Sequence, residues 1–146
     1  MKQNDIINTI EKYFDGFAKK LLDHSRAKLI TYQSKVWLNN EILVMEQLKN
    51  IEGNVYCIFI GREGIFEPVY VGERESNSIK QRLREHLIKK HAKTGSQLKN
   101  VQTTVESGYS ILINTVLIKP DYLRHSLEKY IISQFKHVLI WNIHRR

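Results

Sequence analysis

Four side chains that can bind phosphate or move protons lie within a short stretch of this 146-residue chain. Arg82 and His86 are four residues apart in a segment with helical periodicity, so they lie together on one flank of a predicted helix. Tyr56 and Tyr70 lie in two short apolar runs that precede this segment. A guanidinium group is a permanently charged phosphate ligand, and imidazole and phenol groups exchange protons. These residue types would suit a site that handles phosphate groups, provided that the chain brings them together.

Two strands and a helix are the elements that must position these side chains. Residues 55–60 are apolar, β-branched and aromatic, which is typical of a strand buried on both faces. Residues 61–68 contain two glycines and a proline and predict a hairpin loop, with Pro68 starting the second strand at its edge. If the register pairs even with even numbers, both tyrosines point the same way. Ser78 and Gln81 have capping-box spacing, so we expect the helix to begin there. Its predicted buried stripe consists of Ile79, Leu83 and Leu87.

These motifs together resemble the GIY-YIG nuclease domain. The strand ending in Val55-Tyr56, the strand Val69-Tyr70-Val71-Gly72 and the helical pair Arg82-x-x-x-His86 carry the resemblance. The family also predicts a glutamate inside a later helix and an asparagine near the domain end, and Glu128 and Asn142 are suitably placed. The match covers about residues 53–143. The chain departs from the family in its first motif, which reads Asn54-Val55-Tyr56 rather than Gly-Ile-Tyr.

The resemblance implies a metal-dependent DNA endonuclease that hydrolyses phosphodiester bonds by attack of water. Glu128 would be the metal ligand, because one carboxylate with waters and substrate oxygens suits a single Mg²⁺ or Mn²⁺. The alternative is a helix-surface glutamate beside a basic neighbour. Arg82 would hold the scissile phosphate, and His86 would relay a proton or bind phosphate. Tyr56 and Tyr70 would position or deprotonate the attacking water, and the sequence does not choose between them.

Other residues of the match are expected to shape the site and to contact DNA. Gly72 would let the backbone turn closely into the site, and Asn142 would orient the terminal element or a site group. The Arg82 helix and its exit form the most basic stretch of the chain, which predicts a phosphate-facing surface, or alternatively a solvated helix face. The predicted contacts besides Gly72 are Lys80, Arg84, Lys89, Lys90, His91 and Lys93.

Composition narrows the functions that remain open. The formal net charge of +8 favours a polyanionic partner, nucleic acid above all, or a solubilising surface. No apolar run approaches the roughly 20 residues of a membrane-spanning helix, so we expect no membrane partner. The single cysteine, Cys57, excludes an internal disulfide framework, and with no signal-peptide pattern it favours the cytoplasm. Besides an endonuclease, a non-catalytic nucleic-acid-binding module on the same fold and a basic structural or regulatory protein stay open.

The predicted fold is α/β (α+β). A small three-stranded sheet flanked by helices is expected over residues 51–146, after a helical extension over residues 1–50. Periodicity predicts one helix from Asn4 to about Ile30 and a second from Asn39 or Asn40 to Asn50. We expect this extension to cover a face of the sheet, rather than to contact DNA or a second subunit. The apolar stripe of the first helix is Ile6, Ile10, Phe14, Phe17 and Leu21.

The remaining elements follow the basic helix. Ser96 is predicted to cap another helix that stops near Gly108. Residues 109–118 predict a third, central strand. Asp121 is placed to cap a last helix that runs to about Lys136. Its predicted buried positions are Leu123, Leu127, Ile131 and Phe135.

Overall fold

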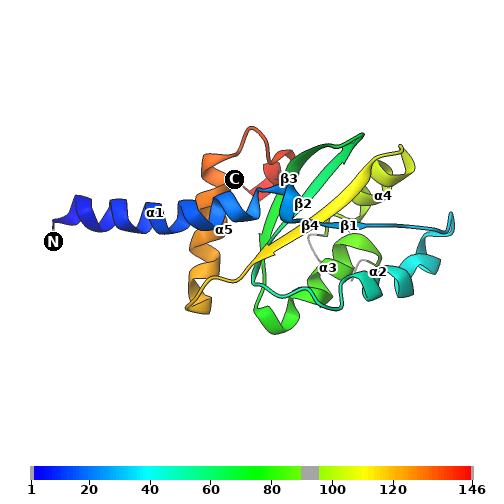
Figure 1. Ribbon diagram of the computed structural model, residues 1–146, viewed down its shortest axis with the longest axis horizontal. Helices are drawn as coiled ribbons and strands as arrows, with labels where there is room; N and C mark the ends of the chain where they lie inside the picture. The colour runs from blue at the N-terminus through cyan, green and yellow to red at the C-terminus, as the bar shows by residue number, and fades with distance from the viewer. Residues whose placement is uncertain (1, 90–95, 146) are drawn as a thin grey trace.

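Four strands form one antiparallel sheet in the order β1-β4-β2-β3 in the computed structural model, which describes residues 2–89 and 96–145 (Figure 1). Strands β2 (Val55–Arg62) and β3 (Ile65–Glu73) are the predicted hairpin. Strand β4 (Ser110–Val116) is central, as expected, and pairs with β2 and with β1 (Lys28–Ile30). The prediction of three strands is therefore wrong by one, because a three-residue strand is too short to show a two-residue period.

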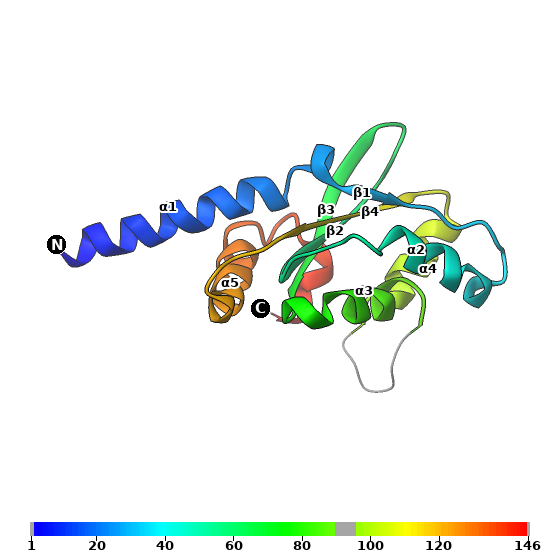
Figure 2. The same ribbon diagram turned by 60° about the horizontal axis from the view of Figure 1, so that its bottom comes forward.

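Helices cover both faces of this sheet. Helices α1 (Gln3–Leu21) and α5 (Arg124–Gln134) contribute to the core on the face that carries Cys57 and Phe59. Helices α2 (Glu41–Gln47), α3 (Ile79–Leu87) and α4 (Leu98–Glu106) pack on the face that carries Tyr56 and Tyr70 (Figure 2). The mixed class of strands and helices is thus as predicted. Single 3₁₀ turns occur at His24–Arg26, Trp37–Asn40, Ser76–Ser78, Asp121–Leu123 and Ile140–Arg145.

The first helix is shorter than predicted and only half of it is packed. Helix α1 ends at Leu21 rather than Ile30, because the chain then turns and enters β1. Phe14 and Leu21 are buried, but the N-terminal half projects from the body and leaves Ile6 and Ile10 exposed (Figure 1). Among the described residues, we find no helix with the length and apolar character needed to cross a membrane.

The hairpin has the even-with-even register that places both tyrosines on one face. Tyr56 is paired with Gly72, and Ile58 with Tyr70. The register then shifts between Ile58 and Phe59, so that Pro68 is the residue paired with Phe59. Pro68 is therefore inside β3 rather than at its start, which an edge strand with an irregular register tolerates.

The helices begin close to the predicted residues, but most of the predicted side-chain capping hydrogen bonds are not formed. Ser78 directly precedes α3, but its side chain makes no capping hydrogen bond. Ser96 Oγ accepts a hydrogen bond of 3.1 Å from the backbone N–H of Leu98, at the start of α4. Asp121 opens a 3₁₀ turn instead of capping α5. Phe135 was predicted to be buried and is exposed, because α5 ends one residue earlier.

Candidate active site

A polar cavity of about 460 Å³ lies at the end of the sheet where β2, β3, α3 and α5 come together. Each of these elements supplies one wall residue: Tyr56, Glu73, Arg82 and Arg124. The chain between β3 and α3 adds Arg74, Glu75 and Ser78. Three arginines and two glutamates line the cavity, and the guanidinium groups are donors that could bind an anion.

His86 holds the hydroxyl group of Tyr56. The distance from Tyr56 Oη to His86 Nε2 is 2.6 Å, and both side chains are buried. His86 Nδ1 accepts a hydrogen bond of 2.9 Å from the backbone N–H of Gln97. A neutral imidazole has one N–H, so this contact assigns the proton to Nε2, which donates to Tyr56 Oη. The proton of the Tyr56 hydroxyl must then point away from His86.

Arg82 is buried beside the same hydroxyl group. Its side chain is 6% exposed, and Nη1 donates to Glu85 Oε1 at 3.0 Å. It also forms a hydrogen bond with Tyr56. Burial alone would lower the pKa of Arg82, but Tyr56, Glu85 and Tyr70 together raise it above its ordinary value. The guanidinium group therefore stays charged at the wall of the cavity.

The two tyrosines and His86 form one aromatic cluster. Ring centroids are 6.2 Å apart for Tyr56 and Tyr70, and 5.3 Å apart for Tyr70 and His86. Tyr56 lines the cavity, while Tyr70 is fully buried next to it. The two strands and the helix thus bring Tyr56, Tyr70, Arg82 and His86 together, which is the condition for a common site.

Gly72 provides space for the Tyr56 ring. It lies directly opposite Tyr56 in the hairpin, and a Cβ atom at this position would be 2.3 Å from Tyr56 Oη and 2.5 Å from Tyr56 Cζ. The role expected of Gly72 was a close turn of the backbone. Instead, Gly72 lies within a regular part of β3, and only the missing side chain matters.

Gly72→Ala should therefore lower stability by displacing the Tyr56 ring. We expect a loss of about 1–3 kcal/mol in the free energy of unfolding, the usual range for an overpacked core. Gly16→Ala is the matched control, because nothing lies within 4 Å of the added Cβ and Gly16 is inside α1. It should raise stability by about 0.5–1 kcal/mol. Equal unfolding midpoints in urea for Gly72→Ala and the unsubstituted protein would contradict this account of Gly72.

Glu128 and Asn142 are both buried, at different places. Glu128 is 7% exposed on α5, one turn after the cavity residue Arg124, so it is not the helix-surface glutamate of the alternative interpretation. Among the described residues, no group of three or more His, Cys, Asp or Glu could hold a metal ion.

Asn142 forms two hydrogen bonds with the backbone of β3 at its free edge. Its Oδ1 accepts from Val71 N at 2.8 Å, and its Nδ2 donates to Val71 O at 2.9 Å.

Two of the residues predicted to contact phosphate, Arg84 and Lys80, bind other groups of the protein instead. Both Glu41 oxygens lie 3.2 Å from Arg84 Nη2, which ties α3 to α2. Lys80 is exposed and donates to the carbonyl of Lys49. Lys89 is exposed. Lys90, His91 and Lys93 lie outside the described residues.

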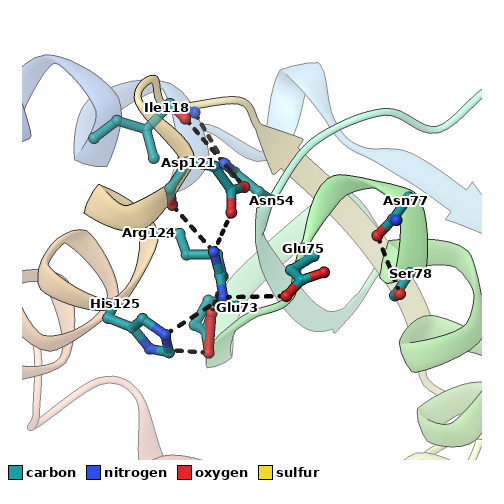
Figure 3. Close-up of polar contacts among 9 residues, drawn as sticks. All are labelled: Asn54, Glu73, Glu75, Asn77, Ser78, Ile118, Asp121, Arg124 and His125. Carbon is teal, nitrogen blue, oxygen red and sulfur yellow. Dashed lines mark hydrogen bonds and ion pairs between the residues drawn. The ribbon is translucent and has the colours of Figure 1, made fainter.

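Arg124 is one of the cavity residues that the sequence did not single out, together with Glu73, Arg74 and Glu75. Its Nε donates to Glu73 Oε2 at 2.7 Å, and its Nη1 pairs with the carboxylate of Asp121 (Figure 3). Asp121 also accepts from Asn54 Nδ2 at 3.0 Å. The only sequence signal was the four-residue spacing between Arg124 and Glu128, which is equally typical of a surface ion pair.

The assembled site has a phenol oxygen held by an imidazole and a guanidinium group at the wall of a cavity lined by three arginines. Such an arrangement can bind an anion and accept a proton from a molecule bound in the cavity. Comparisons with protein-family models, curated proteins and solved structures find no match to this chain. Its function is therefore inferred from its own residues.

Proposed function

We propose that this protein is a divalent-metal-dependent DNA endonuclease of the GIY-YIG type. The observation that supports this most strongly is the contact between Tyr56 Oη and His86 Nε2 beside the buried Arg82, at a polar cavity lined by three arginines. The sequence resemblance assigns roles to these same residues, and their convergence is what those roles require. The excess of positive charge on the chain is consistent with DNA as the substrate.

Arg82 would bind the scissile phosphate. Its planar fork matches two phosphate oxygens, and its charge would be most valuable when negative charge builds up in the transition state. Because Arg82 is buried in a cavity wall, little water competes with the phosphate for its donors.

Tyr56 is better placed than Tyr70 to contact the attacking water, because Tyr56 lines the cavity. Its oxygen accepts a hydrogen bond from His86 Nε2 and has Arg82 beside it. Both neighbours stabilise a negative charge on that oxygen, so they favour release of the hydroxyl proton to solvent in the cavity. The phenolate would then take the proton of the attacking water, and His86 would hold the oxygen in place through its Nε2–H.

Glu128 would be the protein ligand of a hard divalent ion, although it is not among the residues that line the cavity. Glu128 is a buried carboxylate on the helix that also carries Arg124 to the cavity, and a single carboxylate is typical of Mg²⁺ or Mn²⁺ sites that keep several waters and bind phosphate oxygens. When bound, such an ion would neutralise charge on the phosphate. Arg82 and Glu128 would then approach the phosphate from α3 and from α5, which belong to different layers of the fold.

The direct test is cleavage of supercoiled plasmid DNA. We expect nicked and linear products with Mg²⁺ or Mn²⁺ and none with EDTA, followed by electrophoresis over time. Intact plasmid at every metal concentration, despite binding of DNA by the same preparation, would contradict catalysis and favour the non-catalytic binding module.

Binding of DNA should weaken steeply as salt is added. Each phosphate contacted by lysine or arginine lowers log K by about 0.9 per unit of log salt concentration on duplex DNA. Fluorescence anisotropy with a labelled duplex in EDTA, over dilute to physiological salt, measures this slope. An affinity that does not change over this range would count against a phosphate-binding surface.

A further inference from the structure

Arg124 is one of the three arginines at the wall of the cavity, with Arg82 and Arg74. It comes from α5, whereas Arg82 comes from α3, so the two arginines reach the cavity from different layers of the fold. The Arg124 side chain is 14% exposed, so it is largely buried and still open to the cavity. The sequence resemblance assigns it no role.

Two of its three nitrogens are fixed by firm contacts (Figure 3). Nε donates to Glu73 Oε2 at 2.7 Å, and Nη1 pairs with the Asp121 carboxylate. Nη2 has two long contacts, one of 3.5 Å with His125 Nε2 and one of 3.9 Å with Glu75 Oε1, and the second is beyond hydrogen-bond distance. The Glu75 side chain is 62% exposed, so it can move into solvent at little cost.

We propose that Arg124 is a second phosphate-binding residue of this site, and that Glu75 occupies its Nη2 side when no nucleic acid is bound. This inference rests on the proposed function. Carboxylate and phosphate oxygens are alternative acceptors for a guanidinium N–H, so a backbone phosphate of the DNA can take the place of Glu75 at Nη2. Arg82 would bind the scissile phosphate, and Arg124 would bind a neighbouring phosphate of the same strand and set its register.

Asn54 and Asp121 act as positioning residues for Arg124. Asn54 is fully buried, and its amide donates to Ile118 O at 2.9 Å and accepts from Ile118 N at 2.9 Å. It also donates to Asp121, which pairs with Arg124. Asn54 thus ties the segment before α5 to the start of β2. Asn54, which stands in place of the glycine of the Gly-Ile-Tyr motif, is the residue that holds this network.

The test is a double-mutant cycle on DNA affinity. We would measure Kd for a labelled duplex by anisotropy in EDTA for Glu75→Gln, Arg124→Gln and the double variant, with Glu11→Gln as the control. Glu11 is exposed on α1, so its loss changes the net charge equally without touching the cavity. Glutamine at position 124 removes the charge but keeps an amide that can still bond with Glu73 and Asp121.

We expect Glu75→Gln to tighten binding about two- to fivefold more than Glu11→Gln does, which is the range of an exposed ion pair. In the Arg124→Gln background this extra gain should vanish. Arg124→Gln alone should weaken binding about 10-fold or more and reduce the salt slope by about 0.9, the value for one lost phosphate contact. An ion pair with a purely structural role would not change the slope.

The role of Arg124 would be refuted if Glu75→Gln raised DNA affinity equally in both backgrounds, or if Arg124→Gln left the salt slope unchanged. Cleavage by the wild-type protein would in that case still support the proposed function. A wild-type protein that neither binds nor cleaves DNA would overturn both. If Arg124→Gln does not fold, the comparison of Glu75→Gln with Glu11→Gln decides the matter, because equal gains would refute the exchange of Glu75 for phosphate.

Discussion

Glu128→Ala should abolish metal-dependent cleavage of DNA while leaving much of the DNA binding. Glu128 is the buried carboxylate of α5, one turn from Arg124, and we propose that it holds the divalent ion. Removing the ion's protein ligand should cost more than the about 10²–10³-fold that is typical of losing one transition-state donor. Single-turnover cleavage with saturating Mg²⁺ or Mn²⁺ measures the loss.

Controls must separate this effect from a damaged fold. Glu128→Gln keeps the size of the side chain and removes its charge, so it should be as inactive as the alanine variant. Glu106→Ala removes an exposed helical glutamate from α4 and should cleave at the wild-type rate. Binding of Mn²⁺, followed by electron paramagnetic resonance in the presence of DNA, should weaken only in the Glu128 variants. A folded Glu128→Ala protein with wild-type turnover would remove Glu128 from the mechanism.

The aromatic and basic centre of the site follows from local sequence patterns. A two-residue period predicts which residues share a strand face, and a four-residue spacing predicts which share a helix flank. The hairpin register then brings Tyr56 and Tyr70 together, and the following helix carries Arg82 and His86 to the same face. Contacts between adjacent elements are the ones that such patterns can predict.

The outer part of the site depends on contacts between distant segments. Arg124 is held by Glu73 and Asp121, and Asp121 by Asn54, so three separate segments meet there. Nothing in the local pattern of any one segment predicts the others. The basic stretch has the same dependence: charge alone does not tell whether an arginine such as Arg84 faces solvent or a glutamate on another helix.

The N-terminal segment was misjudged because its short strand has no pattern of its own. Strand β1 exists because β4 offers an unpaired edge, to which Lys28–Ile30 adds. Pairing with a distant strand overrides the helical tendency of the local sequence.

Tyr56→Phe should lower the single-turnover rate of cleavage by about 10²–10⁴-fold, the range for loss of a general acid–base group. Tyr70→Phe should have a smaller effect, because Tyr70 is buried beside the cavity and Tyr56 lines it. Phenylalanine keeps the ring in both cases, so the pair is a matched comparison of two hydroxyl groups on one sheet face.

Thermal melts decide whether such a loss is catalytic. Tyr56→Phe removes the acceptor of the His86 Nε2 proton, and we expect this to cost about 1–3 kcal/mol, the penalty of a buried donor left without a partner. A loss of that size lowers the melting temperature by several degrees without unfolding the protein at assay temperature. A folded Tyr56→Phe protein that has lost cleavage but still binds DNA therefore supports proton transfer by the hydroxyl. Wild-type cleavage by both Tyr56→Phe and Tyr70→Phe would leave the tyrosines as packing residues and refute the proposed chemistry.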